Sequence, residues 1–292
     1  MYKEQGDRVN KTLWFKEEKL LAWTGVLGVV MALLCGIGAL LYGVEDTPGK
    51  GLAKAFSFNA ALGVFLLSTA AISPLSGMKP KGKAVFRWTY FTLALYSYFA
   101  ETVQHARGVN PRFVEDGSAF DSLVANGFAF VALLLVVFYL FFAAQFFRKR
   151  SYALQPEIVM SIRYAMVAVL LSFAGGIWIS VNGGRDFGAD GNLIWFHGLG
   201  FHAIQALPIV GWLTMRATMP AMAKRMIIHV SGIAFLGGLL AIGWQTALER
   251  TLAEWTLLPL AALAFFLVVT AAGARALLEA VRSTRAASAA SK

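Results

Sequence analysis

The sequence predicts an all-α membrane protein with eight transmembrane helices and both termini in the cytoplasm. Three observations predict this fold: a shortage of charge, the spacing of the apolar runs and the placement of the basic residues. Of the 292 residues, 58% are hydrophobic and 14% are charged. Because soluble domains carry about 25% charged residues, this composition indicates a chain that lies in a lipid bilayer.

The apolar runs have the length that a bilayer demands. A helix needs about 20 apolar residues to cross the hydrocarbon core, and a crossing segment must be helical because lipid offers its backbone no hydrogen-bond partner. The sequence therefore predicts helices over residues 20–42, 58–77, 88–105, 122–147, 162–181, 196–216, 227–246 and 256–281.

These helices define the predicted domain organisation. The transmembrane domain covers residues 20–281 and follows a cytoplasmic N-terminal segment over residues 1–19. The end of the chain, residues 282–292, reads "RSTRAASAASK" and is predicted to be a disordered cytoplasmic tail because small and polar residues dominate it.

The basic residues predict the orientation. With eight helices, 20 of the 26 Lys and Arg residues lie in the terminal segments and in the loops on the same side. Cytoplasmic loops are enriched in Lys and Arg, so that side is predicted to be cytoplasmic. The net charge of +10 is then a consequence of topology, and it does not indicate a nucleic-acid partner.

Several kinds of functional site are excluded because the residues that they require are absent from the sequence. The single cysteine, Cys35, allows no intrachain disulfide, no cysteine-based metal site and no iron–sulfur cluster. The sequence contains neither the Gly-x-Ser-x-Gly element of many hydrolases nor the His-Glu-x-x-His element of zinc proteases. The motifs therefore assign no reaction to the chain.

Polar side chains gather in two predicted helices, and polar residues inside a membrane mark candidate sites. The third helix contains "YSYFAETVQHARG", and the sixth begins "WFHGLGFHAIQALP". At 1.5 Å per residue, Glu101 and His202 would lie about 5 Å and about 6 Å above the midplane, while His105 and His197 would lie about 10 Å and about 13 Å above it. We therefore predict a site in the outer leaflet between these helices, formed by Glu101, Gln104, His105, His197, His202 and Gln205.

The neighbours of these residues predict local structure. Ser97 and Tyr98 lie one turn below Glu101 and are predicted to hydrogen-bond it. Gly198 and Gly200 predict a close helix approach. Pro208 cannot donate to the carbonyl of the residue four positions earlier and predicts a kink.

Charged residues in the two outer loops are predicted to form a polar lid. The functional candidates among them are Arg107, Asp121 and Arg185. Glu115 and Asp116 lie in the first of these loops. An ordinary solvated loop is the alternative interpretation.

The two polar segments resemble those of a family of multi-pass bacterial membrane proteins. Its members carry Gln-x-x-Arg-Gly followed by Phe-Asp, and later His-x-x-Gly-x-His-x-x-Gln-x-x-Pro. The resemblance covers residues 95–215, and this chain has Pro111-Arg112 where the family often has Ser-His. It implies a bacterial inner membrane and the location of a site, and it implies no activity. The matching residues are Gln104, Arg107, Gly108, Phe120, Asp121, His197, Gly200, His202, Gln205 and Pro208.

Three functions stay open at this point. In the first, His105, His197, His202 and Glu101 bind haem or a divalent metal such as zinc or copper, because imidazole and carboxylate are ligands for these metals. In the second, Glu101 and His202 carry protons in a transporter or channel. In the third, the polar residues are non-catalytic and only join helices, and Glu101 pairs with His202 or Arg107. A quinone or another small ligand reaching the site from the outer side is a further alternative.

Overall fold

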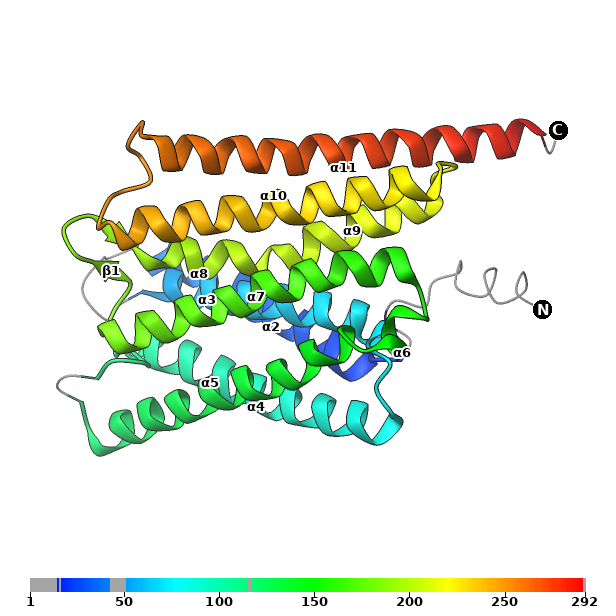
Figure 1. Cartoon of the computed structure of the whole chain (residues 1–292). Helices are drawn as coiled ribbons and strands as arrows, with labels where there is room; N and C mark the ends of the chain where they lie inside the picture. Colours follow the sequence, from blue (N-terminus) through cyan, green and yellow to red (C-terminus); the bar gives the residue numbers. More distant parts are fainter. Residues whose placement is uncertain (1–14, 16, 43–50, 115–116, 291–292) are drawn as a thin grey trace. The chain divides into compact units, whose positions relative to one another are not determined.

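The computed structural model describes residues 15, 17–42, 51–114 and 117–290, and these residues are almost entirely helical (Figure 1). All eight predicted runs form helices. The chain divides into two compact units, residues 1–142 and 143–292, which we call unit 1 and unit 2. Helix α5 contains the boundary between them.

Among the residues that the structure describes, unit 1 contains three helices, a short 3-10 turn and most of a fourth helix. The helices are α2 (Lys19–Tyr42), α3 (Leu52–Ile72), α4 (Pro80–Ala106) and α5 (Ala119–Phe146), with the turn η1 (Ser73–Ser76) after α3. Helices α2 and α3 approach closely where two glycines meet. A Cβ atom on Gly25 would lie 2.8 Å from the carbonyl oxygen of Gly63, so larger residues would force these helices apart.

Large aromatic side chains join α4 to α5 inside unit 1. The rings of Phe86 and Phe142 are stacked with centroids 4.5 Å apart, and Tyr90 and Tyr139 pack beside them. The Tyr90 hydroxyl donates to the Leu135 carbonyl oxygen at 2.6 Å, which satisfies the phenol in this apolar cluster.

Unit 2 contains the remaining helices and one small hairpin. Its elements are α6 (Lys149–Tyr152), α7 (Pro156–Asn182), α8 (Leu193–Phe201), α9 (Ala203–Arg216), α10 (Ala221–Ala247) and α11 (Leu257–Ala290). Helices α10 and α11 lie side by side (Figure 1). Between α7 and α8, β1 (Asp186–Phe187) pairs antiparallel with β2 (Gly191–Asn192), and Asp186 lies opposite Asn192.

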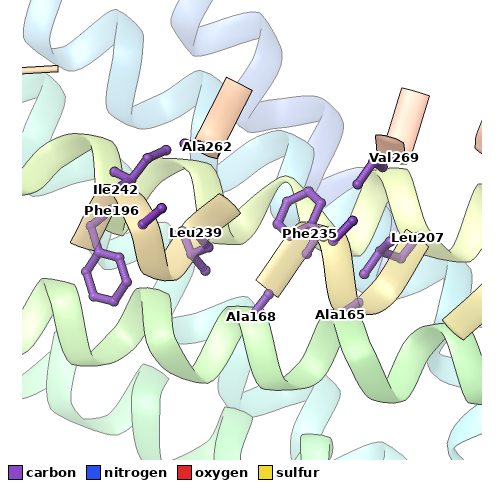
Figure 2. Packing of buried hydrophobic residues seen from close by; sticks show 12 residues of the cluster. Ala165, Ala168, Phe196, Leu207, Phe235, Leu239, Ile242, Ala262 and Val269 are labelled. Carbon is purple, nitrogen blue, oxygen red and sulfur yellow. The ribbon is translucent and has the colours of Figure 1, made fainter. Parts of the chain in front are cut away.

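The core of unit 2 is an apolar cluster drawn from α7 to α11. Alanines on α7 let the other helices approach closely, and larger side chains from α8, α9 and α10 fill the space between them. Figure 2 shows these residues along the cluster: Ala165, Ala168, Phe196, Leu207, Phe235, Leu239, Ile242, Ala262 and Val269.

Seven helical segments in the described part of the chain are long and apolar enough to span a membrane, which makes the chain a multi-pass membrane protein. They are Lys19–Leu41, Leu52–Ser76, Ala119–Phe146, Pro156–Asn182, Leu193–Arg216, Ala221–Ala247 and Leu257–Ala289. Helix α4 is not among them. Its 27 residues are long enough, but its charged residues, together with the tyrosines and threonines between them, lower its hydropathy.

The last helix differs from the sequence expectation. Helix α11 continues to Ala290, through most of the segment that the composition predicts to be a disordered tail. Alanine has the highest helix propensity of the amino acids, and four of the nine residues from 282 to 290 are alanines, so the helix can continue there.

Candidate functional site

The end of α4 is fixed by a glycine that adopts a left-handed conformation. Gly108 has φ 75°, a value that glycine tolerates best. Its N–H donates to the His105 carbonyl oxygen at 3.1 Å, and the Val109 N–H donates to the Gln104 carbonyl oxygen at 2.9 Å. This pair of bonds is the Schellman motif, so the Arg-Gly of the sequence element is explained by the way α4 ends.

The next residues fold back toward α4. The Asn110 side-chain oxygen accepts hydrogen bonds from the N–H groups of Arg112 and Phe113, at 3.0 Å and 3.3 Å. A turn stabilised by an asparagine side chain is common directly before proline, here Pro111. It places Arg112 beside Glu101, on the preceding helix.

Arg112 binds one carboxylate oxygen with two nitrogens. Its Nε donates to Glu101 Oε1 at 2.7 Å, and its Nη2 lies 2.5 Å from the same oxygen. The guanidinium also lies over the rings of Phe58 and Phe128, 5.3 Å and 5.8 Å from their centroids. Arg112 therefore links residues of α3, α4 and α5 within unit 1.

The second oxygen of Glu101 faces a histidine. Glu101 has 0% exposed surface, and its Oε2 lies 3.3 Å from Nε2 of His105, one turn later on α4. No described residue gives Oε2 a well-formed hydrogen bond. A buried carboxylate oxygen with incomplete hydrogen bonding is uncommon and marks a candidate site.

Beside this cluster, Asp121 closes a second polar network. Its Oδ1 accepts from Gln104 Nε2 at 3.0 Å and from Arg107 Nη1 at 2.6 Å. Its Oδ2 accepts from the N–H and hydroxyl of Ser118 at 3.0 Å and 2.7 Å, and the Asp121 N–H reaches the Ser118 hydroxyl at 3.3 Å. This reciprocal pattern is a capping box at the start of α5. The predicted site residues Gln104, Arg107 and Asp121 therefore act together.

His197 is held by α7 within unit 2. Its Nδ1 lies 2.7 Å from the Ser172 carbonyl oxygen, and the Ser172 hydroxyl donates to the His197 carbonyl oxygen. The ring fits against Gly176, where a Cβ atom would lie 2.7 Å from His197 Cε1. The glycine pair 175–176 therefore makes room for this histidine.

His202 lies at a break in the sixth predicted helix. Helix α8 ends before it and α9 begins after it, and its Nδ1 lies 3.2 Å from Oε1 of Gln205. Pro208 lies inside α9, and the interruption of the helix comes six residues before it, so the kink expected at Pro208 stays a prediction. Gly200 does make a predicted close approach, because a Cβ there would lie 2.8 Å from the Ala168 carbonyl oxygen, whereas the space at Gly198 is open.

The outer-loop candidates have different surroundings. Arg185 is exposed, and its Nε lies 3.9 Å from Asp186 Oδ1. Its carbonyl oxygen accepts from the Leu193 N–H at 2.8 Å, which helps to close the loop that holds β1 and β2. Glu115 and Asp116 lie outside the described residues.

Two predicted contacts of Glu101 are wrong. The Tyr98 hydroxyl donates to the Thr24 carbonyl oxygen, and the Ser97 hydroxyl donates to the Leu93 carbonyl oxygen in its own helix. Arg107, a partner expected for Glu101 in the structural alternative, pairs with Asp121 instead. The pairing of Glu101 with His202 stays a prediction.

The metal hypothesis receives no support from the part of the chain that the structure describes. Within residues 15, 17–42, 51–114 and 117–290, no group of three or more His, Cys, Asp or Glu side chains could hold a metal ion. The fourth histidine, His229, lies with its Nδ1 2.8 Å from the Tyr164 hydroxyl.

Sequence reasoning missed a second ionic cluster at the start of α4. Glu18 is buried beside Arg87, with Oε2 3.3 Å from Arg87 Nε, and its Oε1 accepts from the Ser73 hydroxyl at 3.3 Å. Burial raises the pKa of Glu18, and the nearby charges of Arg87 and Lys83 oppose this shift only in part. The sequence places Glu18 in a charged terminal segment, so no pattern indicated that its carboxylate is buried.

Comparisons with known proteins return no match for this chain among family models, curated proteins or solved structures.

Proposed function

We propose that the chain is a proton-coupled transporter or channel of a bacterial inner membrane, with Glu101 and His105 as its proton-binding pair. The observation that carries this proposal is the contact between a fully buried carboxylate and an imidazole. Glu101 Oε2 lies 3.3 Å from His105 Nε2 in a chain with at least seven helices that suit a bilayer. Ionisable pairs inside membranes are typical of proton pathways.

Helix α4 is the eighth transmembrane helix in this proposal. Its charged residues lie near its two ends, at Lys81, Lys83 and Arg87 and then at Glu101, and the residues between them are uncharged. With eight crossings, the distribution of Lys and Arg supports a topology with both termini in the cytoplasm and Glu101 toward the outer side.

The chemistry follows from the fixed charges around the pair. The Arg112 guanidinium supplies a counter-charge to the buried Glu101 side chain. Histidine is the side chain that most readily changes charge between pH 5 and 8. When His105 accepts a proton, Glu101 Oε2 is in position to stabilise the imidazolium, and release of that proton restores the neutral cluster.

Proton flux into liposomes tests this function. The purified protein is reconstituted into liposomes that enclose a pH-sensitive dye. Internal acidification is then followed after a pH gradient and a membrane potential are imposed. His105→Gln is expected to reduce the rate to that of empty liposomes. His229→Gln is the matched control and is expected to keep the wild-type rate, because His229 hydrogen-bonds Tyr164 and has no carboxylate partner among the described residues. Equal rates in the two variants would remove the proposal.

A structural role is the second candidate, and one observation favours it. Gln104, Arg107, Asp121 and Ser118 form a closed network that needs no ligand. Interhelical polar contacts in membranes contribute about 0.6 kcal/mol each on average. In this case Glu101→Gln would lower the thermal stability, and the wild-type protein would give no more proton flux than empty liposomes.

Binding of haem, zinc or copper by His105, His197, His202 and Glu101 stays a prediction. An absorption spectrum and an elemental analysis of the purified protein test it. A Soret band, or a stoichiometric metal that is lost on His202→Ala and kept on His229→Ala, would support it. A colourless and metal-free protein would leave the proton pair and the structural network. Saturable binding of an added quinone would be the sign of the quinone alternative.

A further inference from the structure

An apolar groove lies between α4 and α5 of unit 1. Its volume is about 460 Å³, and the side chains that line it include Val85 and Phe86 of α4 and Val137 and Phe141 of α5. Phe86 forms a fixed wall because its ring is stacked on Phe142. Phe141 is 50% exposed, so the groove is open and its surface is uncovered by the described chain.

A glycine keeps the groove open on the α4 side. Gly82 is one of the lining residues, and a Cβ atom built on it meets no atom within 4 Å. Any larger side chain at this position would extend into unoccupied space. Gly82 is therefore a position where the groove can be filled by one substitution.

Unpaired positive charge lies at the start of α4, where one lysine lines the groove and a second lies two residues earlier. Lys81 lines it, and Lys79 precedes the first residue of α4. Both are exposed, and within the described residues neither has an ion-pair partner, whereas Lys83 pairs with Glu17 and Arg87 with Glu18. No side chain caps the start of α4, so the amide groups of its first turn add to the positive field.

We propose that this groove binds an anionic phospholipid, with one acyl chain between α4 and α5 and the phosphate beside Lys79 and Lys81. The apolar lining matches an acyl chain, and the lysines match a phosphate. Basic pockets between transmembrane helices are a known form of binding site for anionic lipid headgroups. A zwitterionic lipid also carries a phosphate, but its ammonium group offsets that charge, and an inorganic phosphate would leave the apolar groove empty. This inference is independent of the Glu101–His105 pair.

Native mass spectrometry of the purified full chain tests the proposal. The protein in mild detergent is titrated with phosphatidylglycerol and, separately, with phosphatidylcholine of the same acyl chains. Phosphatidylglycerol is expected to bind more tightly. Lys81→Gln is expected to weaken phosphatidylglycerol binding about fivefold, the effect of one basic residue at an anionic surface, and to leave phosphatidylcholine unchanged.

Variants that fill the groove distinguish the contribution of the acyl chain to binding from that of the headgroup. Gly82→Trp is expected to weaken the binding of both lipids, and Val137→Trp fills the groove from the α5 wall if the first variant does not fold. Lys149→Gln removes the same charge outside the groove and is expected to change neither lipid. Equal binding of the two lipids by the wild-type protein would overturn the proposal. Displacement of phosphatidylglycerol by millimolar phosphate would also overturn it, because a free anion would then be the ligand.

Discussion

Arg112 and Glu101 are joined through a single oxygen: Nε and Nη2 of the arginine lie 2.7 Å and 2.5 Å from Glu101 Oε1. This leaves Oε2 of the same carboxylate to face His105 at 3.3 Å. The arginine reaches this position only because α4 ends at a left-handed glycine and the chain then turns at Asn110. The turn after α4 therefore supplies Arg112 as the counter-charge for Glu101 of the same helix.

Arg112→Gln is expected to destabilise the protein by about 3 kcal/mol, the low end for a broken buried ion pair. The low end applies because the Arg112 side chain is 40% exposed while Glu101 is fully buried. Thermal unfolding in detergent measures the change. Arg185→Gln breaks an exposed pair and is expected to cost less than about 1 kcal/mol.

A double variant checks why Arg112→Gln loses stability. Glu101→Gln in the Arg112→Gln background removes the uncompensated charge, so it is expected to recover part of the lost stability. If the two substitutions were instead additive, the arginine would act through its contacts with Phe58 and Phe128 and not through Glu101.

Ser118→Ala is expected to cost about 1 kcal/mol, because it removes the N-terminal cap of α5. Asp121→Ala is expected to cost more, since Gln104 and Arg107 then lose their shared acceptor as well. The two thermal midpoints are compared under the same conditions. A smaller loss for Asp121→Ala than for Ser118→Ala would contradict the closed network.

Gly200→Ala and Gly198→Ala form a matched pair on α8. A Cβ at Gly200 would lie 2.8 Å from the Ala168 carbonyl oxygen, so this variant is expected to lose about 1–3 kcal/mol by overpacking. Gly198 has open space around it, and alanine there is expected to be neutral or to stabilise the helix by up to about 1 kcal/mol. Thermal unfolding of both variants in one detergent measures the difference, and equal stabilities would count against the close approach of α7 and α8.

The stability contributed by Glu18 is expected to fall as the pH rises. Burial raises the pKa of Glu18 above its ordinary value of 4.5, so folding favours the protonated carboxyl. This contribution is fully present below pH 4.5 and is lost as the pH rises through the higher pKa of the folded state. The thermal midpoint of the wild type relative to Glu18→Gln should therefore decrease over this range, and a difference that increases with pH would contradict the buried position of Glu18.

The sequence predicted the helices well because apolar length determines them. All eight apolar runs are helical, although α4 is too polar to be recognised as a spanning helix by hydropathy alone. The break at His202 was not predictable from Pro208, because proline is accommodated inside α9. Hydropathy locates helices, and it does not locate their interruptions.

The residues of the candidate site were easier to predict from the sequence than the contacts between them. Glu101 and His105 are four residues apart, so their contact follows from helix geometry. The partnership of Glu101 with Arg112 depends on a loop reversal that spacing alone does not reveal. The capping box had a readable signal in Ser118-x-x-Asp121, which precedes an apolar run. The glycine that accommodates the His197 ring, Gly176, had no such signal.

The proton flux of Glu101→Gln is the sharpest measure of whether Glu101 and His105 carry protons. The variant keeps the size of the side chain and removes the carboxylate that faces His105. We expect liposomes containing folded Glu101→Gln to acidify no faster than empty liposomes, while wild-type liposomes acidify faster than both. A folded Glu101→Gln protein with the wild-type rate would show that Glu101 and His105 do not carry the proton.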